Sequence, residues 1–162
     1  MQFLQQLNAL LLRIAGWGVI VTMGIIAVVI PYEVAERYFL GNMPAWSGEL
    51  ATFSLVWASM LGAAIGLKKG YQVGMTFFLE KLSGRLALII RVTGQLVMLG
   101  FLALMVYYGS EQTLLNLHQV SPALEIKMAV PYAALPIGFC LMLLVTLEEL
   151  FTMFGTGAQG RS

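Results

Sequence analysis

Long apolar stretches alternate with short polar connections along this chain. The charged residues bound four uncharged stretches, which comprise residues 14–32, 50–67, 92–110 and 128–147. At about 1.5 Å of rise per residue, each stretch forms a helix of roughly 27 to 30 Å, the thickness of the hydrocarbon core of a bilayer. Apolar and polar side chains do not alternate within them, as they would on the strands of a membrane barrel. The pattern therefore predicts an all-α integral membrane protein, with a single four-helix membrane domain over residues 1–162.

Two other segments have amphipathic helical spacing. The first precedes the first span and places its apolar side chains on one face, namely Phe3, Leu4, Leu7, Leu10 and Leu11. We expect it to be an interfacial lead-in rather than a cleavable signal, because Arg13 is the first basic residue and follows the segment. The second segment covers residues 71–83, where Tyr71, Met75 and Phe78 share one face. It predicts a short amphipathic helix on the cytoplasmic surface between the second and third spans.

Composition and charge narrow the class of protein. Hydrophobic residues make up 59% of the chain and charged residues 10%, whereas about 25% of the residues of a soluble domain are charged. The net charge of +1 excludes the strongly basic surface typical of nucleic-acid binding. Cys140 is the only cysteine, so neither an internal disulfide nor a zinc-thiolate site can form, and we read it as a packing residue.

The distribution of basic residues predicts the orientation. With both termini in the cytoplasm, seven of the nine Lys and Arg residues lie inside, as the positive-inside rule requires. Five of these seven lie in the second connection or at its ends, and four of them are expected to lie near lipid headgroups, namely Lys68, Lys69, Lys81 and Arg85.

The spans hold little that could do chemistry or carry a charged solute. No ionisable residue lies in the middle of any span, where such residues mark ion and proton pathways. His118 lies in an outer connection and is read as a surface or packing residue. The sequence therefore predicts no catalytic, metal or cofactor site in this chain.

Small residues recur every fourth position in the second span. Ser54, Ala58, Gly62 and Gly66 form a stripe of the kind that lets membrane helices approach closely. The stripe could pack within the four-helix unit or against a larger membrane partner, and spacing alone does not separate these readings. In the fourth span, Pro131 and Pro136 predict a structural kink.

The outer connection between the first two spans carries a second group of candidates. Trp46 is placed for the membrane interface, and Glu49 for the first turn of the second helix, where a carboxylate suits the helix dipole. Glu33 and Arg37 have the i,i+4 spacing of an ion pair. Glu49 is thus either a carboxylate of the cap region or the partner of Arg37 or of a basic group on another protein.

Several of these residues, in this order, carry a family resemblance. The chain resembles the small membrane subunit (DctQ-like) of tripartite ATP-independent periplasmic (TRAP) transporters. The motifs that carry the resemblance are Arg37-Tyr38, Trp46, Glu49-Leu50, Trp57, Leu61-Gly62-Ala63-Ala64 and Lys68-Lys69, followed by Ser121-Pro122-Ala123-Leu124 and Leu135-Pro136-Ile137-Gly138. The likeness extends from about Leu11 to Leu150. The chain departs from the family pattern at Gln72-Val73 and Thr76, where a histidine and an aspartate are common, and at Ile126-Lys127.

The resemblance implies a non-enzymatic role in a bacterial or archaeal cytoplasmic (inner) membrane. A periplasmic binding protein would deliver an organic acid, such as a C4-dicarboxylate, sialic acid or sugar acid, to a large permease subunit that binds substrate and sodium ions. This chain would scaffold the large subunit, with contacts expected at Trp46, Glu49, Ser54, Ala58, Gly62 and Gly66 and outer-surface docking at Arg37 and Glu49. The alternatives are a scaffold for an unrelated complex and a self-sufficient small multidrug-type transporter, although the first span lacks the embedded acid that such a transporter needs.

Overall fold

The computed structural model describes the backbone of residues 2–39, 41, 44–79 and 84–156, and the side chains of 4–39, 41, 44–70 and 89–152. Five helices follow one another: α1 (Gln2–Phe39), α2 (Ala45–Leu79), α3 (Gly84–Leu115), the one-turn α4 (Ala129–Tyr132) and α5 (Ala134–Thr156). Strands are absent from these residues, apart from one isolated antiparallel bridge between Val120 and Lys127. The all-α prediction is confirmed.

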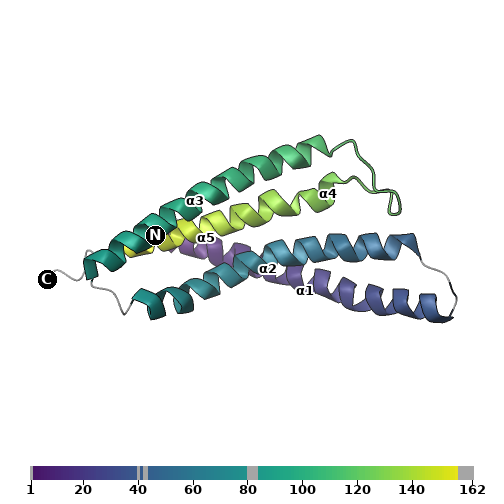
Figure 1. Ribbon diagram of the computed structural model, residues 1–162, viewed down its shortest axis with the longest axis horizontal. Helices are drawn as coiled ribbons and strands as arrows, with labels where there is room; N and C mark the ends of the chain where they lie inside the picture. The colour runs from purple at the N-terminus through teal and green to yellow at the C-terminus, as the bar shows by residue number, and fades with distance from the viewer. Residues whose placement is uncertain (1, 40, 42–43, 80–83, 157–162) are drawn as a thin grey trace.

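Four helical segments are long and apolar enough to cross a membrane. They are Leu4–Phe39, Ala45–Gly70, Ile89–Leu115 and Ala129–Thr152, and each overlaps one uncharged stretch of the sequence. The first residues of α1 and α3 and the last residues of α2 and α5 lie at one end of the molecule, and the α3–α4 connection lies at the opposite end, with the end of α1 and the start of α2 (Figure 1). We call these the terminal end and the loop end.

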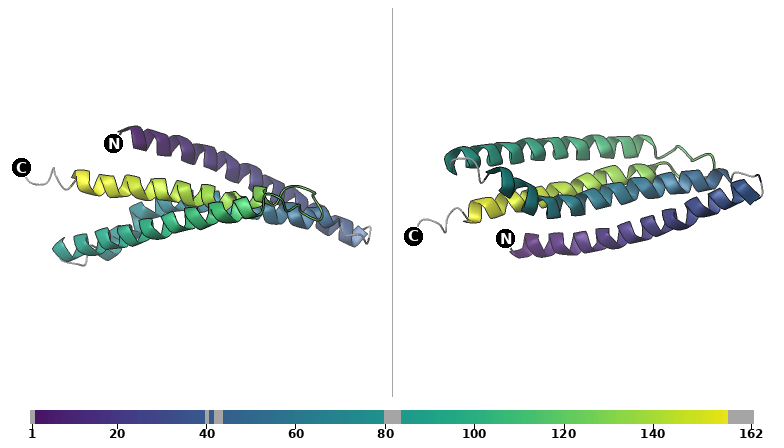
Figure 2. Two further views of the ribbon diagram at one scale, coloured as in Figure 1. Left: turned by 90° about the horizontal axis from the view of Figure 1, so that it is seen from above. Right: turned by 60° about the horizontal axis from the view of Figure 1, so that its bottom comes forward.

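The helices pack side by side in a row. α1 packs mainly on α2, α2 on α5, and α5 on α3, so α2 and α5 occupy the middle (Figure 2). A glycine lies at each seam. A Cβ atom at Gly18 would lie 2.7 Å from Leu61, one at Gly138 2.7 Å from Met60, and one at Gly109 3.2 Å from Pro136. The contact at Gly138 is the most restrictive of the three, because a Cβ atom there would meet both the Cβ atom and the backbone of Met60, whereas at Gly18 it would meet the end of the flexible Leu61 side chain.

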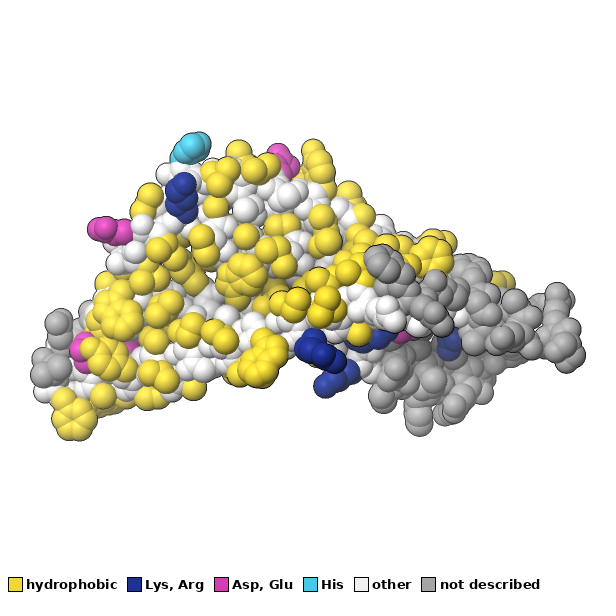
Figure 3. All heavy atoms as spheres, turned by 180° about the vertical axis from the view of Figure 1, so that it is seen from behind, with side chains coloured by type: hydrophobic (Ala, Val, Ile, Leu, Met, Phe, Trp, Pro, Cys, Tyr) yellow, Lys and Arg dark blue, Asp and Glu magenta, His cyan; other side chains and the backbone are white. Residues whose placement is uncertain are grey.

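The core of this row is small. Ala64, Leu102 and Met142, one each from α2, α3 and α5, form its buried centre. Large apolar side chains cover much of the visible face (Figure 3), as expected for a surface in contact with lipid rather than water. In the fourth span the helix is interrupted at Ala133, between Pro131 and Pro136, because Pro136 has no N–H to donate. The helix is thus broken at the place where the two prolines predicted a kink.

The segment expected to form a separate surface helix is organised differently. Residues 71–79 are helical, but they continue α2 without a break, and residues 80–83 lie outside the described residues. The glycines at 70 and 74 do not end the helix. The structure therefore does not confirm a separate amphipathic helix over 71–83. The lead-in is likewise continuous with the first span, since α1 runs unbroken from Gln2 through Pro31 to Phe39.

Candidate functional site

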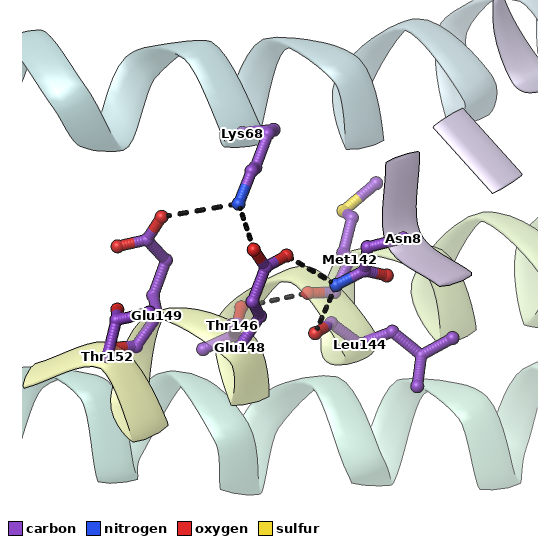
Figure 4. Close-up of polar contacts among 8 residues, drawn as sticks. All are labelled: Asn8, Lys68, Met142, Leu144, Thr146, Glu148, Glu149 and Thr152. Carbon is purple, nitrogen blue, oxygen red and sulfur yellow. Dashed lines mark hydrogen bonds and ion pairs between the residues drawn. The ribbon is translucent and has the colours of Figure 1, made fainter. Parts of the chain in front are cut away.

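Polar side chains gather at both ends of the row, outside its apolar middle. At the terminal end, Asn8 of α1, Lys68 of α2 and both Glu148 and Glu149 of α5 form what we call the inner cluster (Figure 4). The Lys68 Nζ atom lies 2.8 Å from Glu148 Oε1 and 3.6 Å from Glu149 Oε1. Three helices are thereby connected by charge and hydrogen bonding at one level of the membrane.

Glu148 is the central residue of the inner cluster. Its side chain is 9% exposed, against 28% for that of Lys68. The Asn8 Nδ2 group donates to Glu148 Oε2 at 2.7 Å and to the Leu144 carbonyl oxygen at 3.0 Å. A carboxylate that is almost completely buried is tolerated where it is paired with a cation and hydrogen-bonded. Both conditions hold here, so the cluster fixes α1 and α2 against α5.

The inner cluster was not predicted from the sequence. Lys68 was expected at lipid headgroups, but its amine contacts two carboxylates of α5 instead. Lys69 is exposed, whereas Lys81 and the side chain of Arg85 lie outside the described residues. A signal was present, because Lys68 and Glu148 each follow the last residue of an uncharged stretch. Opposite charges at the same membrane depth can pair if their helices are neighbours, and the sequence does not say which helices are neighbours.

At the loop end, Glu49 holds the outer connection. Its carboxylate accepts a hydrogen bond from the Ser121 hydroxyl and from the backbone N–H groups of Ala123 and Leu124, at 3.3 and 3.1 Å. Ser121 is buried, and it belongs to a short hairpin in which its N–H donates to the Ile126 carbonyl oxygen at 2.9 Å. We call these contacts the outer latch; they join the start of α2 to the connection between α3 and α4.

The predicted pairings of Arg37 do not form among the described residues. Glu49 contacts the 121–124 turn, and Glu33 accepts a hydrogen bond from the Ser47 hydroxyl at 2.9 Å. Arg37 is exposed near the end of α1. Trp46 is partly exposed and packs on Tyr32, with ring centroids 5.8 Å apart, an arrangement that suits aromatic residues near a membrane interface.

The small-residue stripe of α2 is divided between two environments. Ser54 and Ala58 are buried within the chain, whereas a Cβ atom at Gly62 or Gly66 would meet no other atom within 4 Å. The division follows from helix geometry, because a step of four residues advances about 400°, or roughly 40° beyond a full turn. Over three steps the stripe therefore rotates by about 120°, from the interior at Ser54 to the outside at Gly66.

No group of three or more His, Cys, Asp or Glu residues that could hold a metal ion occurs in the part of the chain that the structure describes. Gln95, the most polar side chain within the third uncharged stretch, is buried in α3. The polar contacts of the inner cluster and the outer latch thus hold neighbouring helices together.

Comparison with known proteins identifies the family. The profile described as "Tripartite ATP-independent periplasmic transporters, DctQ component" matches residues 25–156. The sialic acid TRAP transporter small permease protein SiaQ of Vibrio cholerae is 24% identical over 131 residues, which cover 81% of this chain and 76% of that protein.

Two further relatives carry names of the same transporter class. The C4-dicarboxylate TRAP transporter small permease protein DctQ of Rhodobacter capsulatus is 29% identical over 69% of this chain and 50% of its own length. The isethionate TRAP transporter permease protein DctMQ of Oleidesulfovibrio alaskensis is 26% identical over 65% of this chain, but over only 17% of its own length.

Proposed function

Because the chain belongs to the DctQ component family of TRAP transporters, we propose that it scaffolds a large permease subunit for the uptake of an organic acid. The observation that carries this proposal is the family match across residues 25–156, which covers most of the four-helix row. TRAP small permeases are transporter components, a class distinct from enzymes. Both termini are assigned to the cytoplasm, which places the terminal end inside and the loop end in the periplasm.

A supporting role agrees with where this chain keeps its charged groups. The described ion pairs lie at the terminal end, and the outer latch lies at the loop end. The four uncharged stretches hold no Asp, Glu, Lys, Arg or His that could serve a passing solute. Substrate and sodium ions are therefore assigned to the large subunit, and this chain contributes helix packing.

The exposed part of the α2 stripe is the proposed contact with the large subunit. Gly62 and Gly66 have free space beside their backbone, while Ser54 and Ala58 are already buried in the row. Backbone that another helix can approach closely favours association in a bilayer, where no hydrophobic force drives helices together. Trp46 was also expected at this interface, but it lies sixteen residues before Gly62, about 160° around α2, and it packs on Tyr32 of α1. Glu49 acts indirectly, by fixing the outer latch.

The outer surface is the proposed meeting point with a periplasmic binding protein. Arg37 is exposed at the loop end, and Glu49 is engaged by the 121–124 turn. Arg37 is therefore the better placed of the two for docking. Replacing Arg37 by glutamate should weaken capture of the binding protein without changing assembly with the large subunit. Equal capture by Arg37→Glu and wild type would exclude this role.

The substrate is proposed by class only. The relatives are named for sialic acid, isethionate and C4-dicarboxylate, all of which are organic acids or their anions. The relative named DctMQ is a single permease protein of which this chain matches a small fraction. A fusion of that kind is consistent with a small subunit that works in permanent contact with a larger one.

Copurification from the native membrane tests the proposal. A tagged chain should bring down a much larger polytopic protein in roughly equal amount. Gly66→Leu should reduce that recovery about fivefold or more, because overpacking a helix contact costs at least ~1 kcal/mol. Gly24→Leu is the matched control, since Gly24 is also an exposed helical glycine with nothing within 4 Å of a Cβ atom.

The alternatives predict different outcomes. A scaffold of an unrelated complex would copurify with a different kind of protein. A self-sufficient transporter would be recovered alone or as a homo-oligomer and would move solute in liposomes without help. Either result would overturn the proposed function, and identical recoveries with Gly66→Leu and Gly24→Leu would remove the α2 stripe from the interface.

A further inference from the structure

An apolar groove opens between α1, α2 and α5. Its volume is about 570 Å³. Leu11, Ile14, Gly18 and Thr22 of α1 form one wall, and Leu61 of α2 and Leu141 of α5 lie opposite.

The groove offers its occupant almost no hydrogen bonding. Thr22 is the one hydroxyl residue in the lining, and its hydroxyl bonds within α1, 2.8 Å from the Gly18 carbonyl oxygen and 3.1 Å from that of Val19. The indoles of Trp17 and Trp57 complete the lining with one N–H group each. A polar solute would lose its hydration without compensation there, so the occupant must be apolar along the length of the groove.

The length and position of the groove match one leaflet of the bilayer. Leu11 and Thr22 are eleven residues apart on a continuous helix, a rise of about 16 Å. Half of the hydrocarbon core is roughly 15 Å thick. The groove therefore begins at the membrane boundary of the terminal end and stops near the middle of the bilayer, at the depth where an acyl chain ends.

A basic residue lies near the polar end of the groove, outside its lining. Arg13 lies next to Ile14 on α1 and is exposed, and Trp17 follows one turn later with its side chain 66% exposed. Long basic side chains extend toward headgroups, and tryptophan favours the boundary between headgroups and acyl chains. Basic residues at this depth attract anionic lipids. Arg13 thus supplies a positive charge at the membrane depth of the mouth, and this charge complements a phosphate group.

We propose that this groove binds one phospholipid from the leaflet at the terminal end, with an acyl chain between α1, α2 and α5 and an anionic headgroup beside Arg13. The shape of the groove favours a lipid over a partner helix. Contacts between membrane helices are rich in small residues, whereas Ile14, Trp17 and Val21 form a bulky rim around the small residues of the floor. A flexible acyl chain can bend past these bulky side chains and lie in the groove.

Native mass spectrometry of the full-length protein, purified with whatever subunit accompanies it, tests the proposal. Vesicles of phosphatidylethanolamine and phosphatidylglycerol supply the lipid before extraction in mild detergent. The wild type should retain one phospholipid, enriched in phosphatidylglycerol. Ile14→Trp should lose it by filling the mouth of the groove. Ile20→Trp is the matched control. Ile20 lies on the same helix and is 62% exposed, close to the 59% of Ile14, but it does not line the groove.

A second pair of variants tests the headgroup. Arg13→Gln should lower the preference for phosphatidylglycerol about fivefold, the effect of one basic residue near the surface, whereas Arg37→Gln at the loop end should leave it unchanged. A phosphatidylglycerol probe with a diazirine in its acyl chain should label residues 11–22 most strongly. Equal retention by Ile14→Trp and Ile20→Trp would overturn the proposal, as would crosslinking of position 14 to a helix of the large subunit. Recovery of the large subunit is a separate readout, so these failures leave the proposed function standing.

Discussion

The Lys68–Glu148 ion pair of the inner cluster should stabilise the helix row by an amount that the structure allows us to estimate. At 2.8 Å and an effective dielectric constant of about 20, the attraction between the two charges is roughly 6 kcal/mol. Desolvation of both ions offsets much of it. Removing one partner of a buried pair costs about 3–5 kcal/mol, because the other charge is left uncompensated. Since the Lys68 side chain is 28% exposed, water can partly solvate Glu148, and we expect Lys68→Met to cost about 2–3 kcal/mol.

Equilibrium unfolding in mixed detergent micelles, followed by tryptophan fluorescence, measures this cost. Lys69→Met is the control, because it removes the same side chain one position away at an exposed site; its effect should stay within about 0.5 kcal/mol. The double variant Lys68→Met/Glu148→Gln removes both charges. Its loss of unfolding free energy should be smaller than the sum of the losses in the two single variants by at least about 1 kcal/mol. If Lys68→Met and Lys69→Met destabilise equally, or if the single effects add, the inner cluster does not stabilise the row through charge pairing.

Three further predictions concern the other fastenings. Glu49→Gln should speed hydrogen exchange at the Ala123 and Leu124 amides about tenfold, since hydrogen bonds to a charged acceptor contribute roughly 1.5–3 kcal/mol; exchange unchanged relative to Glu111→Gln would contradict the outer latch. Asn8→Ala should lower the free energy of unfolding by about 1–2 kcal/mol through loss of its bonds to Glu148 and Leu144, and Gln5→Ala at an exposed position should not. Gly138→Ala should lower the free energy of unfolding by about 1–3 kcal/mol in the same micelle assay, because its new methyl group would contact Met60 at 2.7 Å. Gly100→Ala is the control, since space is open beside Gly100. If Gly138→Ala costs no more than Gly100→Ala, the contact between α2 and α5 can relax.

The sequence alone determined the class of fold, because the bilayer imposes its own length and polarity on a chain. Helices of about 20 apolar residues are nearly the only way to satisfy backbone groups in hydrocarbon, so counting residues between charges was enough to find four of them. A disturbance of the last span was also predictable, because Pro131 and Pro136 lie five residues apart, whereas the single Pro31 leaves α1 unbroken. The resemblance of several short motifs, taken in order, identified the family, and the profile match over residues 25–156 confirms it.

Only the tertiary structure decided which polar groups meet. Glu49 and Ser121 were both visible in the sequence, yet 72 positions separate them, and hydropathy says nothing of which helix lies beside which. The same holds for Lys68 and Glu148, which pair because α2 and α5 are neighbours in the row. The stripe from Ser54 to Gly66 was readable as a spacing, but its division into a buried and an open half depends on how α2 is rotated against α5. Hydrophobicity along a chain fixes depth in the membrane, whereas lateral order and helix rotation arise from packing between residues that are distant in sequence.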